Sequence, residues 1–361
     1  MRLSPLLLSA LVAGPAFAEP PKVVADIAPV HALLSQVMAG VAEPHLLLEQ
    51  NADPHAVQLR PSQARMLADA DLLVWVGPEL NPWLEGIVAT EGTDNLALTG
   101  HPATQLRTFG DAEDTHAEHD EHDHDDGEQE GEDHDDGDHA DGDHDDADHD
   151  DGAMADGDAA DAGADHAEDH DPAEGEDPAE SDDHGHSHSG IDPHVWLSTK
   201  NARIWLDVFA DTLAARDPEH AETYRENAVR AAAELDALDA RIQDRLAGHQ
   251  GAEIVTFHEA FGYFVEEFGI EVVGSVRPGD ASAPSAAALD ALRDLVAEHG
   301  VSCAFAEPAY DPGLLDAIAG GTGLRIGTLD PTGSTQPTGP GQYAATLEGI
   351  AVSIADCLEA D

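Results

Sequence analysis

Residues 111–190 form an acidic, histidine-rich segment that an ordinary hydrophobic core could not contain. The segment holds 36 Asp and Glu and 13 of the chain's 22 histidines, but no Lys, Arg, Phe, Tyr or Trp. Such a stretch buries too little apolar surface to offset the entropy of ordering its backbone, so we expect it to be disordered without a ligand. The fold must therefore be built from the parts of the chain that flank the segment.

The charge balance argues against two classes of partner. The chain has 361 residues and a formal net charge of −60. Nucleic acid is excluded, because phosphate contacts need clustered Lys and Arg. Docking on an anionic membrane surface is disfavoured for the same reason.

Residues 1–18 have the features of a secretory signal peptide. Arg2 supplies a positive start, residues 6–12 are mostly apolar, and Ala16-Phe17-Ala18 is a small-x-small cleavage site. We therefore expect a secreted mature chain that begins at Glu19. No Cys lies near the cleavage site, so we do not expect a lipid anchor. The alternative is a cytosolic protein with an apolar start.

Short apolar runs alternate with helical patterns along both flanking parts. The expected strands are residues 23–25, 44–48, 72–77, 253–256, 270–273, 301–305 and 324–329. The expected helices are residues 29–40, 61–70, 258–268, 285–299, 312–319 and 342–358. Strands that alternate with helices indicate parallel βα units.

A long helix is predicted between the two sets of βα units. Asp217-Pro218 is a typical helix start, Gly248 is a typical end, and neither Gly nor further Pro lies between them. At 1.5 Å per residue the helix would be roughly 45 Å long. We therefore predict an α/β fold of two βα lobes with central sheets, joined by a single long rigid helix. The expected divisions are residues 19–216 for the N-terminal lobe, 217–248 for the connecting helix and 249–361 for the C-terminal lobe.

The histidines of the acidic segment favour metal capture. His134, His139, His144 and His149 recur every five residues, and His184, His186 and His188 follow at alternate positions. Imidazole suits Zn, Cu and Ni, whereas carboxylate suits Mg, Ca and Mn. A calcium loop around Gly131 fails, because its twelfth position is Gly137 instead of Glu. The remaining alternative is an insert that only keeps the protein soluble.

Three of the nine other histidines lie at predicted strand-to-helix turns. They are His55, His194 and His258. Ligands of α/β sheets collect at the carboxyl ends of strands, so these histidines are candidates for a shared metal site. Each of them taken singly could be an ordinary loop histidine. No metalloprotease spacing follows His258, and no Gly-x-Ser-x-Gly motif occurs.

The chain has two cysteines, Cys303 and Cys357. A disulfide between them would suit an oxidising compartment and would stabilise the fold by about 4 kcal/mol through loop closure. Two free buried thiols are the alternative.

The sequence resembles the zinc-specific substrate-binding proteins of bacterial ABC importers, the ZnuA type. The matching stretches are Asp53-Pro54-His55, Leu59-Arg60-Pro61-Ser62, residues 74–79, residues 192–197, residues 256–264, residues 305–308 and Leu329-Asp330-Pro331. An acidic histidine-rich insert before the second histidine and a C-terminal cysteine pair are also traits of this family. The resemblance covers nearly the whole mature chain.

The resemblance implies one metal site in a cleft between the two lobes. His55, His194 and His258 would be the zinc ligands, and either Asp330 or water would be the fourth. Pro54 stands where some zinc-binding members have a Glu ligand. A histidine at the third position favours zinc, since manganese-binding relatives have Glu there.

The resemblance implies a periplasmic protein that captures Zn²⁺ and delivers it to the membrane permease of an ABC importer. We expect a monomer that is not an enzyme, with the acidic segment assisting metal capture. A stand-alone periplasmic metal buffer is one alternative. A zinc hydrolase is another, although no general base with a recognisable catalytic spacing supports it.

Overall fold

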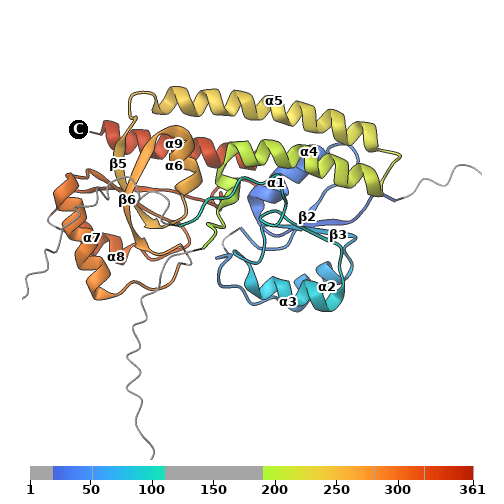
Figure 1. The fold of residues 1–361 in the computed structure, drawn as a ribbon, viewed down its shortest axis with the longest axis horizontal. Coiled ribbons are helices and arrows are strands. Elements are labelled where there is room, and N and C mark those ends of the chain that lie inside the picture. The colour runs from blue at the N-terminus through green and yellow to red at the C-terminus, as the bar shows by residue number, and fades with distance from the viewer. Residues whose placement is uncertain (1–18, 51, 110–189, 280, 321, 361) are drawn as a thin grey trace, which may run out of the picture. The chain divides into compact units, whose positions relative to one another are not determined.

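The computed structural model describes residues 19–50, 52–109, 190–279, 281–320 and 322–360 (Figure 1). The predicted signal peptide and the seven metal-capture histidines of the acidic segment lie outside the described residues. None of the described helices is both long enough and apolar enough to span a membrane.

The N-terminal part forms a four-stranded parallel sheet in the order β2-β1-β3-β4. Its strands are β1 (Val23–Ala25), β2 (His45–Leu46), β3 (Leu72–Trp75) and β4 (Asn95–Ala97). Its helices are α1 (Ala28–Val37), α2 (Pro61–Ala68) and α3 (Pro82–Glu91). Every residue of β1 and β3 is buried, as expected of central strands covered on both faces.

The C-terminal part forms a second parallel sheet in the equivalent order β6-β5-β7-β8. Its strands are β5 (Ala252–His258), β6 (Ile270–Arg277), β7 (Cys303–Ala306) and β8 (Arg325–Thr328). Its helices are α6 (Gly262–Phe268), α7 (Ala286–His299), α8 (Gly313–Ala319) and α9 (Gln342–Glu359). In each sheet successive strands are added first on one side of the first strand and then on the other, so the strand order reverses between the two central strands, which is where α/β sheets bind ligands.

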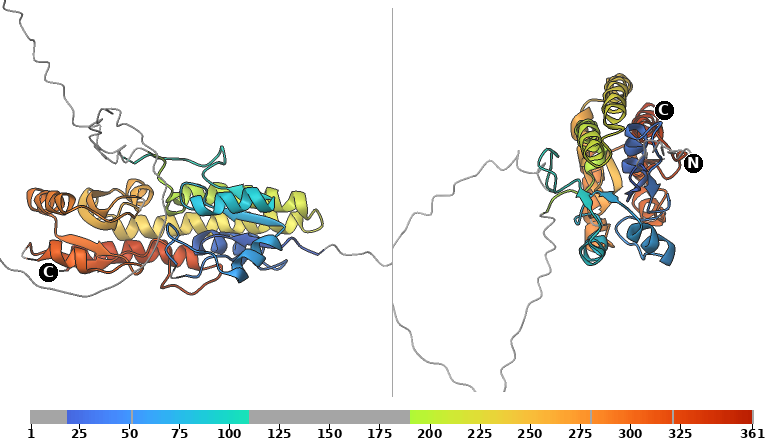
Figure 2. Two further views of the ribbon diagram at one scale, coloured as in Figure 1. Left: turned by 90° about the horizontal axis from the view of Figure 1, so that it is seen from below. Right: turned by 90° about the vertical axis from the view of Figure 1, so that its right-hand side faces the viewer.

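Two long helices connect the two sheets. After the 3₁₀ turn η1 (Val195–Leu197), helix α4 (Thr199–Arg216) leads into α5 (Ala221–Leu246), whose 26 residues span about 39 Å. Helix α5 packs along α4 and also contacts α1 and α9 (Figure 1 and Figure 2). One hydrophobic core continues from the first sheet to the second along these helices. The predicted α/β fold of two βα lobes with a long connecting helix is confirmed, while the exact lobe boundaries stay a prediction.

Several local predictions needed correction. The helix predicted from residue 258 begins at Gly262, because β5 extends to His258. The connecting helix begins at Ala221 instead of residue 217, because Asp217 ends α4 and its carboxylate accepts the hydroxyl of Tyr224. Helices α3 and α4 and strand β4 were not predicted, since their apolar patterns are weak or merge with neighbouring elements.

The two cysteines form the predicted disulfide. Cys303 on β7 is bonded to Cys357 on α9, with 6.1 Å between their Cα atoms. The alternative of two free thiols is therefore wrong. The disulfide fastens the last helix of the chain to a central strand of the second sheet.

Candidate metal centre

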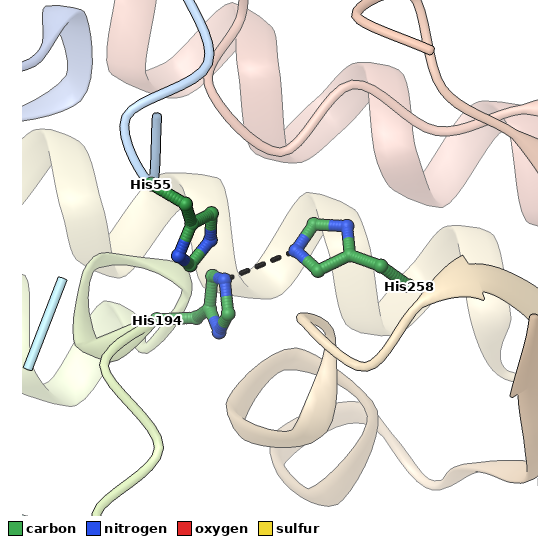
Figure 3. A group of neighbouring side chains, drawn as sticks. All are labelled: His55, His194 and His258. Atoms are coloured by element: carbon green, nitrogen blue, oxygen red, sulfur yellow. Dashed lines mark hydrogen bonds between the residues drawn. The ribbon is translucent and has the colours of Figure 1, made fainter. Parts of the chain in front are cut away.

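Three histidines from separate parts of the chain meet at one point (Figure 3). His55 lies in the loop between β2 and α2, His194 directly precedes η1, and His258 is the last residue of β5. One ring nitrogen from each lies within 4.8 Å of the others. Among the described residues, no other group of three or more His, Cys, Asp or Glu side chains comes together in this way.

The sequence Asp53-Pro54-His55 fixes the first histidine through a local turn. The carboxylate of Asp53 accepts the backbone N–H of His55 at 3.0 Å. Side-chain oxygens of Asp commonly accept a backbone N–H two residues further on, which bends the chain without regular secondary structure. The carbonyl oxygen of Pro54 accepts the indole N–H of Trp83 at 3.3 Å, which ties the turn to α3.

A buried carboxylate orients the second histidine. Oδ1 of Asp192 accepts the backbone N–H of His194 at 3.0 Å and lies 2.8 Å from its ring Nδ1. An ionised carboxylate only accepts hydrogen bonds, so we assign the ring hydrogen to Nδ1. That tautomer leaves the lone pair of Nε2 free to bind a metal.

The third histidine has the same arrangement. Oε1 of Glu307, the residue that follows β7, lies 2.6 Å from Nδ1 of His258 and 3.2 Å from its backbone nitrogen. His258 and Glu307 thus face each other across the two central strands, β5 and β7, where the strand order reverses. Nε2 of His258 is left free to bind a metal, as in His194.

The two free nitrogens point at one another. Nε2 of His194 lies 3.1 Å from Nε2 of His258, the contact dashed in Figure 3. With both ring hydrogens on Nδ1, two lone pairs face each other, which is unfavourable unless a cation lies between them. The arrangement therefore suits a metal ion that shares these nitrogens with His55.

Burial favours the neutral, metal-binding form of His55 and His194. Burial first, and then the neighbouring rings of His194 and His258, lower the pKa of His55 to about 2. Burial also lowers the pKa of His194, against the opposing effect of Asp192. A proton therefore competes weakly with a metal for these two ligands at neutral pH.

The histidines line a small cavity formed mainly by loop residues from both halves of the fold. Its volume is about 20 Å³, which is room for roughly one water molecule. Residues from the first half of the chain, such as Gln50 and Ala52, line one side, and residues after β7 and β8 line the other. Tyr310 stands at the cavity with its ring centroid 5.8 Å from that of His258.

Asp330 lines the same cavity but does not join the three histidines. Its two carboxylate oxygens accept hydrogen bonds from the backbone and hydroxyl groups of Ser334 and Thr335, at 2.8 to 3.1 Å. Its oxygens are not among the ligand atoms that lie within 4.8 Å of one another. As a fourth ligand, Asp330 would have to come closer to the three ring nitrogens than it lies in this structure.

Sequence analysis missed the two carboxylates that orient the histidines. Asp192 and Glu307 both lie in the matching stretches, but neither was assigned a role. The signal for Asp192 is its place two residues before His194, the same spacing as Asp53 and His55. No local signal points to Glu307, because it meets His258 only through the pairing of β5 with β7.

Comparison with known proteins identifies the family. Residues 23–357 match the family model of ZnuA, described as the periplasmic component A of a zinc-uptake complex. The chain belongs to the ZnuA family. It is 46% identical to the high-affinity zinc uptake system protein ZnuA of Paracoccus denitrificans over 100% of both chains. It is 34% identical to ZnuA of Brucella abortus, over 93% of this chain and 91% of that protein.

A crystal structure of ZnuA shares the fold of this chain. The TM-score is 0.64 at 18% identity, covering 93% of this chain and 98% of the other. Since the family is that of an uptake-complex component, the ZnuA match confirms the prediction that this chain is not an enzyme. The alternative of a zinc hydrolase is thereby set aside.

Proposed function

We propose that this protein captures Zn²⁺ in the periplasm and delivers it to the membrane permease of an ABC zinc importer. The observation that carries the proposal is the meeting of three imidazoles, two of which have Nδ1 within hydrogen-bond distance of a buried carboxylate. Three nitrogen ligands and one oxygen form an ordinary zinc set. The names of the relatives from Paracoccus and Brucella support zinc as the cargo.

In this proposal His55, His194 and His258 bind the ion, and either Asp330 or water completes the set. His55 is partly exposed whereas His194 and His258 are buried, and a set with one ligand at the surface favours reversible loading. The protein acts as a monomer, and the histidines of the acidic segment assist capture. A stand-alone metal buffer would need the same site but no permease.

Zinc titration of the full-length protein against a strong chelator tests the site, since the chelator keeps weaker sites empty. His258→Ala should raise the Kd for zinc by at least about 100-fold, as expected when one of three protein ligands is lost. His45→Ala is the matched control, because His45 is exposed on β2. A His258→Ala protein that binds zinc as tightly as the parent would show that the site is assigned wrongly. Zinc uptake in cells that lack the permease separates delivery from buffering.

A further inference from the structure

We propose that Arg107 is a positioning residue of the metal site, which holds Asp192 in the orientation that fixes His194. The inference rests on the proposed function, because it assigns a role toward the zinc ligand His194. Arg107 has no contact with the metal cavity itself. Its effect would pass through the carboxylate of Asp192.

The two oxygens of Asp192 have separate partners. Oδ1 is bound by His194, and Oδ2 accepts a hydrogen bond from Nη1 of Arg107 at 2.7 Å. The Asp192 side chain is fully buried, and that of Arg107 is 16% exposed. Removing the cation from such a pair leaves a buried charge without compensation, which is strongly unfavourable. Without Arg107 the carboxylate would turn toward water or another donor and release the ring of His194.

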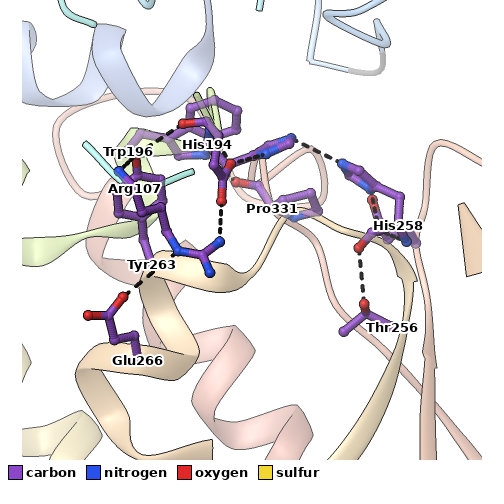
Figure 4. A network of polar contacts seen from close by, with 10 residues as sticks. Arg107, His194, Trp196, Thr256, His258, Tyr263, Glu266 and Pro331 are labelled. Atoms are coloured by element: carbon purple, nitrogen blue, oxygen red, sulfur yellow. Dashed lines mark hydrogen bonds and ion pairs between the residues drawn. The ribbon is translucent and has the colours of Figure 1, made fainter. Parts of the chain in front are cut away.

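The Tyr263 hydroxyl holds the backbone around this pair, while the ring centroid of Tyr263 lies 5.8 Å from Cζ of Arg107. Its hydroxyl accepts the backbone N–H of Arg107 and donates to the carbonyl oxygen of Asp192, both at 3.0 Å. The backbone N–H of Asp192 also donates to the carbonyl oxygen of Arg107 at 3.0 Å. Changing the guanidinium should therefore disturb the carboxylate while these backbone contacts remain (Figure 4).

Gly262 leaves the space that the guanidinium occupies. A Cβ atom at Gly262, the first residue of α6, would lie 1.8 Å from Nη1 and 2.3 Å from Cζ of Arg107. The guanidinium is the far end of a flexible side chain, so it can move aside without disturbing the fold. Gly262→Ala is therefore an independent way to displace the cation without deleting it.

His258 lacks a comparable support. Its carboxylate partner, Glu307, forms no ion pair with an Arg or Lys of the described residues. The influence of Arg107 should therefore pass through His194 alone. A double-mutant cycle can test this difference, because Arg107→Gln should affect zinc binding only when His194 is present.

The test is the Kd for zinc of the full-length protein, measured by chelator competition, with thermal unfolding of the metal-free protein as a check on the fold. Arg107→Gln and Gly262→Ala should each raise the Kd, the former by about 10- to 100-fold, the usual range for partners of metal ligands. Arg107→Lys keeps the charge and should recover most of the affinity. Arg216→Gln is the matched control, because Arg216 pairs with Asp94 away from the cavity. In a His194→Ala background, Arg107→Gln should have no further effect.

Three results would overturn the proposal. The first is an Arg107→Gln protein that binds zinc as tightly as the parent while His258→Ala does not, which would leave the proposed function intact. The second is an equal loss from Arg107→Gln with and without His194, which would indicate a general structural effect. The third is unchanged binding in both Arg107→Gln and His258→Ala, in which case the assignment of the site fails and the role of Arg107 fails with it.

Discussion

Phe109 donates its backbone N–H to the carbonyl oxygen of Gly190 at 3.0 Å, although residues 110–189 lie between them in the sequence. Beside this bond, Thr108 and Ile191 form an isolated antiparallel bridge. The acidic segment therefore leaves and rejoins the described fold at one place. The three histidines of the candidate site all lie outside it.

Replacing residues 110–189 by Asn-Gly should give a folded protein that keeps one tight zinc site. A two-residue turn suits the antiparallel pairing of Thr108 with Ile191. Isothermal titration with zinc should show the loss of weaker sites and an unchanged tight one. If the tight site disappeared while the circular dichroism spectrum stayed the same, the segment would have to supply a ligand.

Glu307→Gln should weaken zinc binding by about 10-fold or more, because a neutral amide holds the Nδ1 hydrogen of His258 less firmly than a carboxylate. Glu253→Gln is a matched control, since Glu253 lies 2.9 Å from Nδ1 of His299 outside the site. Chelator competition measures both variants. Equal Kd values for zinc in the two variants would show that Glu307 has no role in metal binding.

The choice between zinc and manganese should depend on His258 together with Glu307. His258→Glu alone places a second carboxylate beside the buried Glu307, and their repulsion should weaken binding of both metals. Adding Glu307→Gln relieves the repulsion and leaves an oxygen-rich site, so the preference for zinc over manganese should narrow. Competition between the two metals in the double variant, with Glu307→Gln alone as the control, measures this. An unchanged preference would show that ligand softness at residue 258 does not set selectivity.

Removing the disulfide should cost stability but not zinc affinity. Cys303 and Cys357 are 54 positions apart, so replacing both with Ala should lower the free energy of unfolding by about 4 kcal/mol through lost loop closure. Urea unfolding of the metal-free protein measures the change. Thiol labelling of the denatured, unreduced parent should find no free thiol. Labelling of two thiols would contradict the disulfide.

Asp26 should make the folded state sensitive to pH. Burial raises its pKa to about 7, although the N–H groups of Ile27 and Val76 and the amide of Asn81 oppose this. In the unfolded chain an Asp has a pKa of about 4. The stabilising contribution of Asp26 is therefore fully present below about pH 4 and is lost as pH rises through 7, the folded-state pKa. The free energy of unfolding should therefore fall by roughly 2 to 3 kcal/mol between pH 5 and pH 8, relative to Asp26→Asn.

Urea unfolding of the metal-free parent and of Asp26→Asn across that range provides the measurement. Asp26→Asn has no titrating group at residue 26. The difference in free energy of unfolding between the two proteins therefore gives the contribution of Asp26 alone. Parallel pH profiles for the two proteins would show that Asp26 is ionised in the folded state.

Much of the fold could be predicted because its signals are local. Buried parallel strands are short apolar runs, and the end of α5 is marked by Gly248. The start of α5 could not be predicted, because Asp217-Pro218 is a typical helix start but here forms the turn after α4. Helix α3 was missed although Pro82 is its first residue, because its apolar residues do not favour one face.

The sequence by itself determined which residues could serve a metal site. Composition excludes residues 111–190 from a core, and the Asp-Pro-His stretches mark His55 and His194 as turn residues near strand ends. Only the tertiary structure decided which side chains meet. Three ring nitrogens converge, Glu307 reaches His258, and the carboxylate of Asp330 is held by Ser334 and Thr335. The physical reason is that distances between residues far apart in the chain depend on strand order and helix packing, which no local pattern encodes.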